Sequence, residues 1–342
     1  MVAPEDIDFY SLGFNFIETK TMFMATHKKG KWDNGKLIPF GNIEISPASC
    51  VLNYGQGIFE GMKALRAKNG EITLFRPEEN AKRFNFSARR MLMPDYDTNK
   101  FIDAVKKVVK ENEEYIPPYN SNGALYIRPL LFGYGPILGV HSALEFKFII
   151  FVVPVGPYFP EGFKGIDLEI SKKYTRAAPG GTGSAKTICN YAGTMLPAKE
   201  SQERGFAQIL YLDAVQLEYI EEVGAANFFG MIDGKLVTPR KTGTILEGIT
   251  RESILTLASK ILDLEVEERD ISYKELYKDS CTEVFCSGTA AVITPIASVN
   301  IEGKSRIFNN REPGEITSKM YKLLTGIQRL EIEDTFGWMV KI

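Results

Sequence analysis

The chain has 342 residues, 44% of them apolar and 25% charged, so it can bury a sizeable core and exceeds the length of one ordinary domain. A net charge of −2 gives no electrostatic reason to expect nucleic acid or an anionic membrane as a partner. No apolar run is long enough for a membrane span, and the acidic first thirty residues do not resemble a targeting peptide. The four cysteines show no zinc-like pair, so we expect no metal site and a reducing, cytoplasmic location.

The first half of the chain predicts a small domain of strands and helices. Met62–Ala67 and Glu71–Phe75 read as a hairpin closed around Asn69-Gly70. Pro77 is typical of a first helical position, and its helix is expected to continue to about Met91. Thr98 is predicted to cap a second helix. Two further strands are predicted from the apolar runs Ala124–Phe132 and Phe146–Val153.

Prolines and glycines between Pro154 and Gly162 interrupt this pattern and predict a linker between two domains. We therefore divide the chain into a small N-terminal domain (1–153), a linker (154–165) and a larger domain (166–342). In the larger domain, short strands alternate with helices predicted at Asn190–Arg204, Thr250–Leu262 and Gly314–Leu324.

One lysine, Lys186, lies between a run of small residues, Gly180–Ala185, and the pair Asn190-Tyr191. Small residues allow a bulky group to approach the backbone closely. A lysine presented in this way is a candidate for Schiff-base chemistry. Taken alone, such a segment is more often an ordinary loop with a solvated lysine.

A second segment supplies complementary groups. Ala225–Ile232 and Lys235–Thr238 read as strands joined by the turn pair Asp233-Gly234. Gly248-Ile249-Thr250 is expected at a helix N-terminus, where backbone N–H groups attract an anion such as phosphate. Glu222 is expected just before the first strand, and its neighbour Glu221 is expected to face solvent. A phosphate site, a carboxylate and an amine together suit pyridoxal phosphate.

With these motifs, the chain resembles the branched-chain amino-acid aminotransferases of the pyridoxal-phosphate fold-type IV group. The resemblance extends from about Asn53 to the C-terminus. It rests on Tyr54–Lys63, Leu74–Pro77, Tyr126–Pro129, Gly180–Tyr191, Glu222–Arg251 and Ser287–Ala290. It implies an α+β fold of two domains, a smaller N-terminal α/β domain and a larger, mostly β C-terminal domain, with the cofactor between them. It also implies a homodimer or a multiple of dimers.

The resemblance assigns roles to particular residues. Lys186 would form the Schiff base with the cofactor and carry a proton between the substrate Cα and the cofactor's C4′. Glu222 would pair with the cofactor's pyridine nitrogen, and Tyr191 would hydrogen-bond the oxygen on the cofactor's ring. Phosphate contacts are implied for Arg76, Ile249, Thr250 and Thr289. Each of these residues also has a purely structural interpretation, as a surface charge, a helix cap or a core side chain.

Substrate contacts follow from the same resemblance. The Tyr54 hydroxyl and the backbone at Thr289 and Ala290 would meet the substrate carboxylate. Arg128 would support this carboxylate-binding side of the site, directly or through a tyrosine. The side-chain pocket would be lined by Phe59, Tyr126 and Tyr158.

The implied reaction is reversible, ping-pong amino transfer between leucine, isoleucine or valine and 2-oxoglutarate. A D-amino-acid aminotransferase or an aminodeoxychorismate lyase would share the lysine and the glutamate, so both stay open as alternatives. A more remote alternative is a nucleotide-binding loop at Gly180–Thr187, with Ala185 where glycine is required. The sequence does not distinguish a biosynthetic from a catabolic role, or one branched-chain substrate from another.

Two departures from relatives carry expectations of their own. No C-x-x-C pair follows Ser287–Ala290, while Cys281 and Cys286 leave redox regulation open. Glu247 stands where many relatives have proline, and its side chain should point away from the phosphate.

Overall fold

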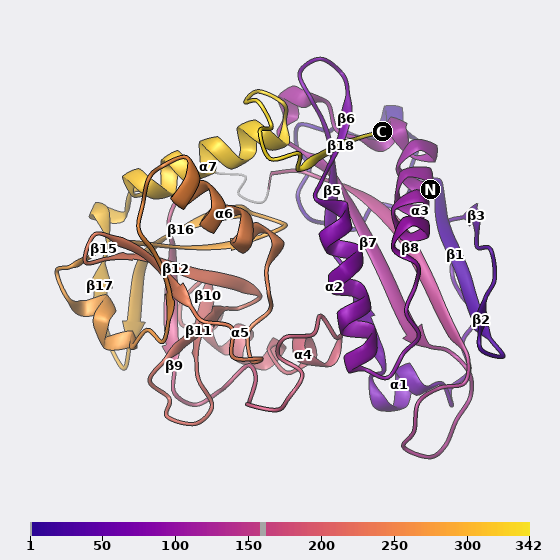
Figure 1. Ribbon diagram of the computed structural model, residues 1–342, viewed down its shortest axis with the longest axis horizontal. Coiled ribbons are helices and arrows are strands. Elements are labelled where there is room, and N and C mark those ends of the chain that lie inside the picture. Colours follow the sequence, from indigo (N-terminus) through magenta and orange to yellow (C-terminus); the bar gives the residue numbers. More distant parts are fainter. Residues whose placement is uncertain (1, 158–161) are drawn as a thin grey trace. The chain divides into compact units, whose positions relative to one another are not determined.

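The computed structural model describes residues 2–157 and 162–342, and these divide into two compact units (Figure 1). Unit 1 comprises Met1–Pro160, Ala185–Cys189 and Ile327–Ile342, and unit 2 comprises Glu161–Ser184 and Asn190–Gly326. Unit 1 thus includes two segments that the sequence places in the larger domain, and it contains slightly more residues than unit 2.

Backbone pairing explains why these two segments belong to unit 1. Ile58 and Thr187 form an isolated antiparallel bridge, and the Ile188 N–H donates to the Gly57 carbonyl at 3.1 Å. At the C-terminus, β18 (Met339–Lys341) pairs antiparallel with β6 (Ile72–Phe75). Both pairings join residues far apart in sequence, and local composition does not signal such pairings.

Unit 1 is built on a nine-stranded sheet in the order β18-β6-β5-β7-β8-β1-β2, with β3 beside β1 and β4 beside β7. The longest ladder joins β7 and β8, from Ala124 opposite Val155 to Gly133 opposite Phe146. This ladder and the hairpin of β5 and β6 confirm the predicted strands. The remaining bounds are β1 Thr21–Lys28, β2 Lys31–Trp32, β3 Lys36–Pro39, β4 Gly57–Phe59, β5 Met62–Arg66, β7 Ala124–Gly133 and β8 Phe146–Val155.

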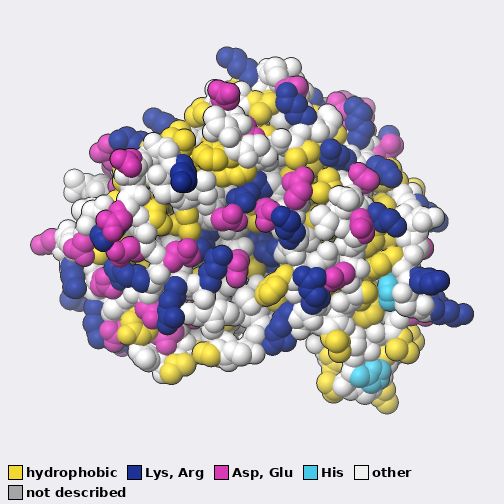
Figure 2. Space-filling model, viewed as in Figure 1, with side chains coloured by type: hydrophobic (Ala, Val, Ile, Leu, Met, Phe, Trp, Pro, Cys, Tyr) yellow, Lys and Arg dark blue, Asp and Glu magenta, His cyan; other side chains and the backbone are white. Residues whose placement is uncertain are grey.

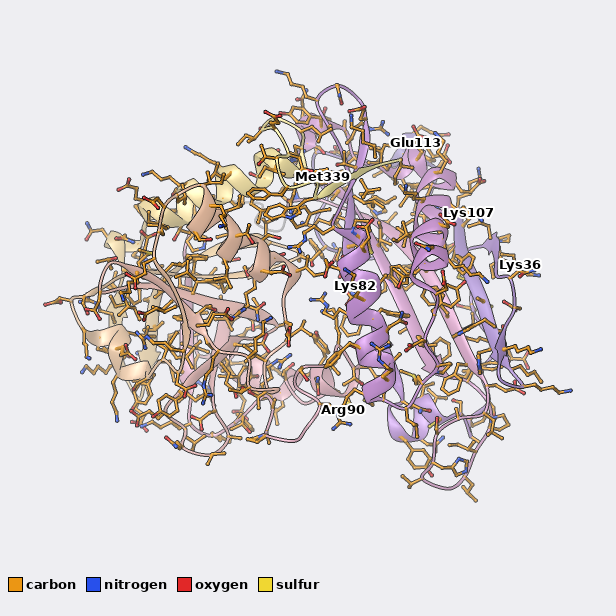
Figure 3. The ribbon with its side chains drawn as sticks, in the orientation of Figure 1. Lys36, Lys82, Arg90, Lys107, Glu113 and Met339 are labelled. Atoms are coloured by element: carbon orange, nitrogen blue, oxygen red, sulfur yellow. The ribbon has the colours of Figure 1, made fainter. Side chains whose placement is uncertain are left out.

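Three helices accompany this sheet: α1 (Cys50–Tyr54), α2 (Pro77–Arg90) and α3 (Thr98–Glu111). In Figure 1, α2 and α3 lie along the sheet, and their apolar side chains, such as Phe84 and Phe101, pack in the core with Phe148 of β8. Their opposite faces carry charges, among them Lys82, Arg90 and Lys107 in Figure 3. Apolar residues therefore recur about every 3.6 positions in these two sequences, as expected for helices with one buried and one exposed face.

One detail of α3 corrects the sequence prediction. The N-cap is Asp97, whose carboxylate accepts the Lys100 N–H at 2.9 Å, whereas Thr98 is the first helical residue. Both residue types are good caps, so two adjacent candidates cannot be separated from composition alone.

Unit 2 is built on a second nine-stranded sheet, in which β9, β10, β11, β12, β15 and β16 form a closed ring of neighbours. Leu168, Phe228, Val284 and Val299 are among the side chains of its buried core. The strand bounds are β9 Ile166–Ser171, β10 Gln208–Leu212, β11 Ile220–Val223, β12 Ala226–Ile232, β13 Lys235–Pro239, β14 Val266–Arg269, β15 Cys281–Gly288, β16 Val292–Ile301 and β17 Lys304–Ile307.

The helices of the second half are α4 (Cys189–Ala192), α5 (Met195–Glu203), α6 (Ile249–Lys260) and α7 (Glu315–Gln328). The helix expected over Asn190–Arg204 is therefore two short helices. The turn of β12 and β13 is confirmed, with positive φ at both Asp233 and Gly234.

The face of the protein shown in Figure 2 carries both signs of charge. In the face shown in Figure 2, Lys and Arg side chains alternate with Asp and Glu. Within the described residues, no helix combines the length and apolarity that crossing a membrane requires. The same residues contain no cluster of three or more His, Cys, Asp or Glu suited to a metal ion.

Candidate active site

Lys186 is held in unit 1 by its backbone. Its carbonyl accepts the Phe59 N–H at 3.0 Å, and its own N–H donates to the Ser87 hydroxyl of α2 at 2.9 Å. The ammonium nitrogen lies 4.7 Å from the centre of the Phe59 ring. The side chain is partly buried, so this lysine is not the solvated loop residue of the alternative interpretation.

A buried carboxylate lies next to this lysine. Glu60 is 0% exposed and accepts two hydrogen bonds from Arg83, at 2.7 and 2.8 Å, and one from Asn80 at 2.8 Å. Burial acts to raise the pKa of Glu60, but Arg83, Lys186 and Asn80 outweigh it, so the net pKa lies below its ordinary value. Glu60 is therefore a fixed negative charge that interacts electrostatically with Lys186.

Helix α2 supplies the partners for both groups. Asn80, Arg83 and Ser87 are three and four residues apart, a spacing that places side chains on one helical face. Sequence reasoning missed this cluster. Its signal was three polar residues at helical spacing among the buried positions of α2.

Three further predicted residues share one region of the unit 1 sheet. The Arg128 guanidinium carbon lies 4.7 Å from the Phe59 ring centre and 5.3 Å from that of Tyr126, and its Nη2 donates to the Tyr126 hydroxyl at 3.3 Å. The sequence leaves open whether Arg128 acts directly or through a tyrosine, and its role in substrate binding stays a prediction. A Cβ at Gly61 would lie 2.2 Å from the Tyr126 hydroxyl, so this close approach requires glycine.

The other predicted residues of unit 1 lie elsewhere. Arg76 adopts a left-handed backbone (φ 48°) at the start of α2, and its guanidinium carbon lies 5.3 Å from the Trp338 ring centre. The Tyr54 hydroxyl donates to the Leu138 carbonyl. Tyr158 lies outside the described residues.

In unit 2, the Glu222 carboxylate on β11 is fixed by three contacts. Its Oε2 forms an ion pair with the Arg176 Nη1 at 2.6 Å and accepts the Leu246 N–H at 3.3 Å. Its Oε1 accepts from the Asn227 amide at 3.1 Å, and that amide also donates to the Leu246 carbonyl. The Arg176 and Glu222 side chains are 3% and 1% exposed, so the ion pair is buried and the carboxylate is held in one orientation.

Arg176 was part of the lysine segment, yet its role was missed. The sequence marks it only as a single arginine before Ala177-Ala178, and no periodic pattern connects it with Glu222.

A row of polar side chains crosses three strands beside Glu222. Glu222 faces Asn227, and Asn227 faces Ser287 on β15. Ser287 is 2% exposed, and within the described part of the chain its hydroxyl has no hydrogen-bond partner. An orphaned hydroxyl at such a position fits a bound polar group.

Three of the four predicted phosphate residues, Ile249, Thr250 and Thr289, lie at or just beyond the ends of helices and strands in unit 2, whereas Arg76 lies in unit 1. Helix α6 begins at Ile249 with Gly248 as its N-cap, and Thr250 is buried in its first turn. Thr289 and Ala290 lie in the turn that follows β15, and Tyr191 lies in α4. A Cβ at Gly248 would lie 2.0 Å from the Asn227 side chain, so the α6 N-terminus is tied closely to the row of polar groups.

The expectation for Glu221 is wrong. This side chain is 7% exposed, and burial raises its pKa to about 7. The physical reason is a bulge. Between the pairs Leu210–Val223 and Leu212–Ile220, β10 has one residue and β11 has two, so the strand alternation is broken at these glutamates.

The remaining expectations concern Glu247, the cysteines and the nucleotide loop. Glu247 is about half exposed and pairs with Lys241 at 3.0 Å. Cys281 and Cys286 are free and buried, and burial raises the pKa of each thiol to about 12. The run Gly180–Thr187 neither follows a strand directly nor opens a long helix, because β9 ends at Ser171 and α4 has four residues. A nucleotide-binding loop requires both features.

Comparisons with known proteins agree with the motifs. Residues 57–299 match the sequence model of the family described as amino-transferase class IV. A branched-chain-amino-acid aminotransferase of Haemophilus influenzae is 44% identical, over 99% of this chain and 99% of the relative. The chloroplastic branched-chain amino acid aminotransferase 2 of Humulus lupulus is 45% identical, over 100% of this chain and 83% of the relative.

Solved structures show the same architecture. The branched-chain amino acid aminotransferase of Escherichia coli has a TM-score of 0.76 at 29% identity, with 94% of this chain and 99% of that chain covered. The T.th. branched-chain amino acid aminotransferase, solved with pyridoxamine 5'-phosphate, has a TM-score of 0.78 at 27% identity, with 95% and 99% covered.

The chain belongs to the class IV aminotransferases. Within that class, its full-length resemblance is to the branched-chain enzymes, as the sequence motifs indicate, and the α+β two-domain fold is confirmed.

Proposed function

We propose that the chain is a pyridoxal-phosphate-dependent branched-chain aminotransferase. It transfers an amino group reversibly between leucine, isoleucine or valine and 2-oxoglutarate in a ping-pong cycle. The observation that carries the proposal is Lys186, whose backbone is hydrogen-bonded to β4 and α2, whose amine lies 4.7 Å from the Phe59 ring centre, and whose charge lowers the pKa of the buried Glu60. The full-length relatives supply the substrate class.

The donor groups of the described residues fit this cofactor. Lys186 offers the amine for its aldehyde, and Glu222 offers a partner that keeps its ring nitrogen protonated. In unit 2, the N-terminus of α6 at Ile249 and Thr250 suits a phosphate. Thr289 and, in unit 1, Arg76 are assigned to the phosphate from the family resemblance. The orphaned Ser287 hydroxyl adds a hydrogen-bonding group, and Tyr191 is assigned to the ring oxygen.

When bound, pyridoxal phosphate supplies a ring that accepts negative charge developing at the substrate α-carbon. The protein's own part is proton transfer and orientation. The Lys186 amine would take the proton from the substrate α-carbon and deliver it to the C4′ carbon of the cofactor. Arg83 holds the buried Glu60 carboxylate in place, and Glu60 follows directly the residue whose ring lies against the Lys186 amine.

Substrate binding is assigned to residues already described. The Tyr54 hydroxyl and the backbone at Thr289 and Ala290 bind the carboxylate, with Arg128 in support. Apolar surface for the branched side chain is assigned to Phe59, Tyr126 and Tyr158. A homodimer or multiple of dimers and a cytoplasmic location belong to the same proposal.

The test is the visible spectrum and turnover of the purified protein. We expect a cofactor band that bleaches when L-leucine is added, and no bleaching with D-alanine, which a D-amino-acid aminotransferase would use. Lys186→Ala should lower turnover by about a hundredfold or more, as expected for loss of a general base, whereas Lys82→Ala on the exposed face of α2 should not. A colourless protein, or a Lys186→Ala variant with undiminished transamination, would disprove the assignment.

A further inference from the structure

Unit 2 contains a cavity that the proposed aminotransferase reaction does not use. Its volume is about 250 Å³, several times the roughly 30 Å³ that one water occupies, so it admits a small organic ligand. The wall is formed by the loop after β10, the start of β11 and the segment that follows β13. Its charged and amide side chains are Asp213, Gln216, Glu221, Arg240 and Asp270.

Two of the acids already have partners. The Asp213 carboxylate accepts backbone N–H groups from Val215, Gln216, Glu218 and Tyr219, at 2.7 to 3.1 Å. Asp270 accepts two hydrogen bonds from Arg240, at 2.7 and 2.9 Å. Neither carboxylate therefore needs a ligand.

Glu221 is different. It is 93% buried, it lines the cavity, and its Oε2 has no hydrogen-bond partner within the described residues. The bulge in β11 places it here, beside Thr244, while Glu222 pairs with Arg176. An unsatisfied buried carboxylate oxygen is costly, and natural proteins rarely leave one without a ligand, water or ion.

The surroundings select the chemistry of that ligand. With Glu221 ionised, the cavity wall holds three carboxylates and one guanidinium, a net negative charge that favours a cation. Pro179, Ile220, Pro239 and Ile245 give the wall apolar surface for short alkyl groups. We propose that this cavity is a second binding site for a small alkylammonium ion, whose N–H group donates to Glu221 Oε2.

The protonation of Glu221 gives the proposed site a pH dependence. Burial raises the pKa of Glu221 to about 7, Glu222 and Asp213 act in the same direction, and Thr244 and Arg176 oppose them. Arg240, paired with Asp270, and Tyr219 are the other ionisable groups of the wall. Because an alkylammonium ion needs the ionised carboxylate, binding should tighten about tenfold between pH 6 and pH 8.

The experiment is isothermal titration of the cofactor-loaded, full-length protein with trimethylammonium chloride. This tertiary ammonium has one N–H donor and cannot condense with the cofactor's aldehyde, so the result does not depend on the proposed transamination. We expect saturable binding at pH 8 and about tenfold weaker binding at pH 6. Tetramethylammonium, which has the charge but no N–H donor, should bind at least about tenfold more weakly.

Variants assign the binding to Glu221. Glu221→Gln should weaken trimethylammonium binding by about tenfold or more, whereas Glu302→Gln, on the exposed surface of the same unit, should leave it unchanged. The proposal is overturned if no saturable binding occurs, if the two ammonium ions bind equally, or if Glu221→Gln binds as tightly as the wild type. The comparison of two probes on the wild-type protein keeps the test decisive even if the variant does not fold.

Discussion

The buried pair of Glu60 and Arg83 makes unit 1 sensitive to a single substitution. Arg83→Met keeps most of the side-chain volume but leaves the Glu60 carboxylate, which is 0% exposed, without its two strongest hydrogen bonds. Removing one partner of a buried ion pair typically costs about 3–5 kcal/mol. We expect Arg83→Met to lower the free energy of unfolding of unit 1 by this amount.

Tryptophan fluorescence during urea unfolding provides the assay. The sequence has two tryptophans, and Trp32 and Trp338 both belong to unit 1, so the signal reports that unit. Lys82→Met is a matched control on the same helix, because its pair with Glu79 is exposed and worth at most about 0.5 kcal/mol. The double variant Glu60→Met/Arg83→Met should recover most of the loss, since it buries no unpaired charge.

The pH dependence of this effect has a definite sign. The folded-state pKa of Glu60 lies below its ordinary value, so the stability from the pair is present above the unfolded pKa of about 4.3 and is lost as the pH falls through the folded pKa. The difference between wild type and Arg83→Met should therefore shrink in acid. Our account of Glu60 as a buried anion is refuted if Arg83→Met costs no more than Lys82→Met at pH 7.

Three further outcomes are expected. Because burial raises the pKa of Glu221 to about 7, its contribution to stability is present below about pH 4.3 and is lost as the pH rises through 7; Glu221→Gln should therefore gain up to roughly 3 kcal/mol over wild type between pH 5 and pH 8 in thermal unfolding, and a constant difference would contradict this. The exposed Cys189 should react with iodoacetamide in the native protein well before the buried Cys286, as peptide mass spectrometry would show; equal rates would argue against the described burial. Asp97→Ala should destabilise α3 by about 1 kcal/mol and Thr98→Ala by less, and the reverse order in urea unfolding would restore Thr98 as the cap.

The elements with strong local signals were predictable from the sequence. Helix α2 begins at Pro77 and α6 at Ile249, as proline placement and apolar spacing indicate. The turn at Asp233-Gly234 follows from its residue types. In contrast, the assignment of Ala185–Cys189 to unit 1 depends on pairing with β4, more than a hundred residues away, and composition carries no trace of it.

The site residues likewise divide into those marked by local sequence motifs and those that are not. Lys186 and Glu222 were singled out because motifs surround them. Arg176 and Glu60 were missed, because a single charged residue looks the same on a surface as in a buried pair. Glu221 was misjudged because an extra residue in a strand reverses which side chains are buried, and adjacent glutamates give no sign of such a bulge.

The path of the chain around Lys186 limits how this protein can be dissected. The five residues Ala185–Cys189 belong to unit 1, although the chain on either side of them belongs to unit 2. A fragment ending near Pro160 would omit the lysine, and one starting there would carry it without the strand it pairs with. Split reporters or domain exchanges should therefore leave the chain unbroken where it enters unit 1 at Ala185 and where it returns to unit 2 after Cys189. New termini are better placed in exposed turns such as the one at Gly303.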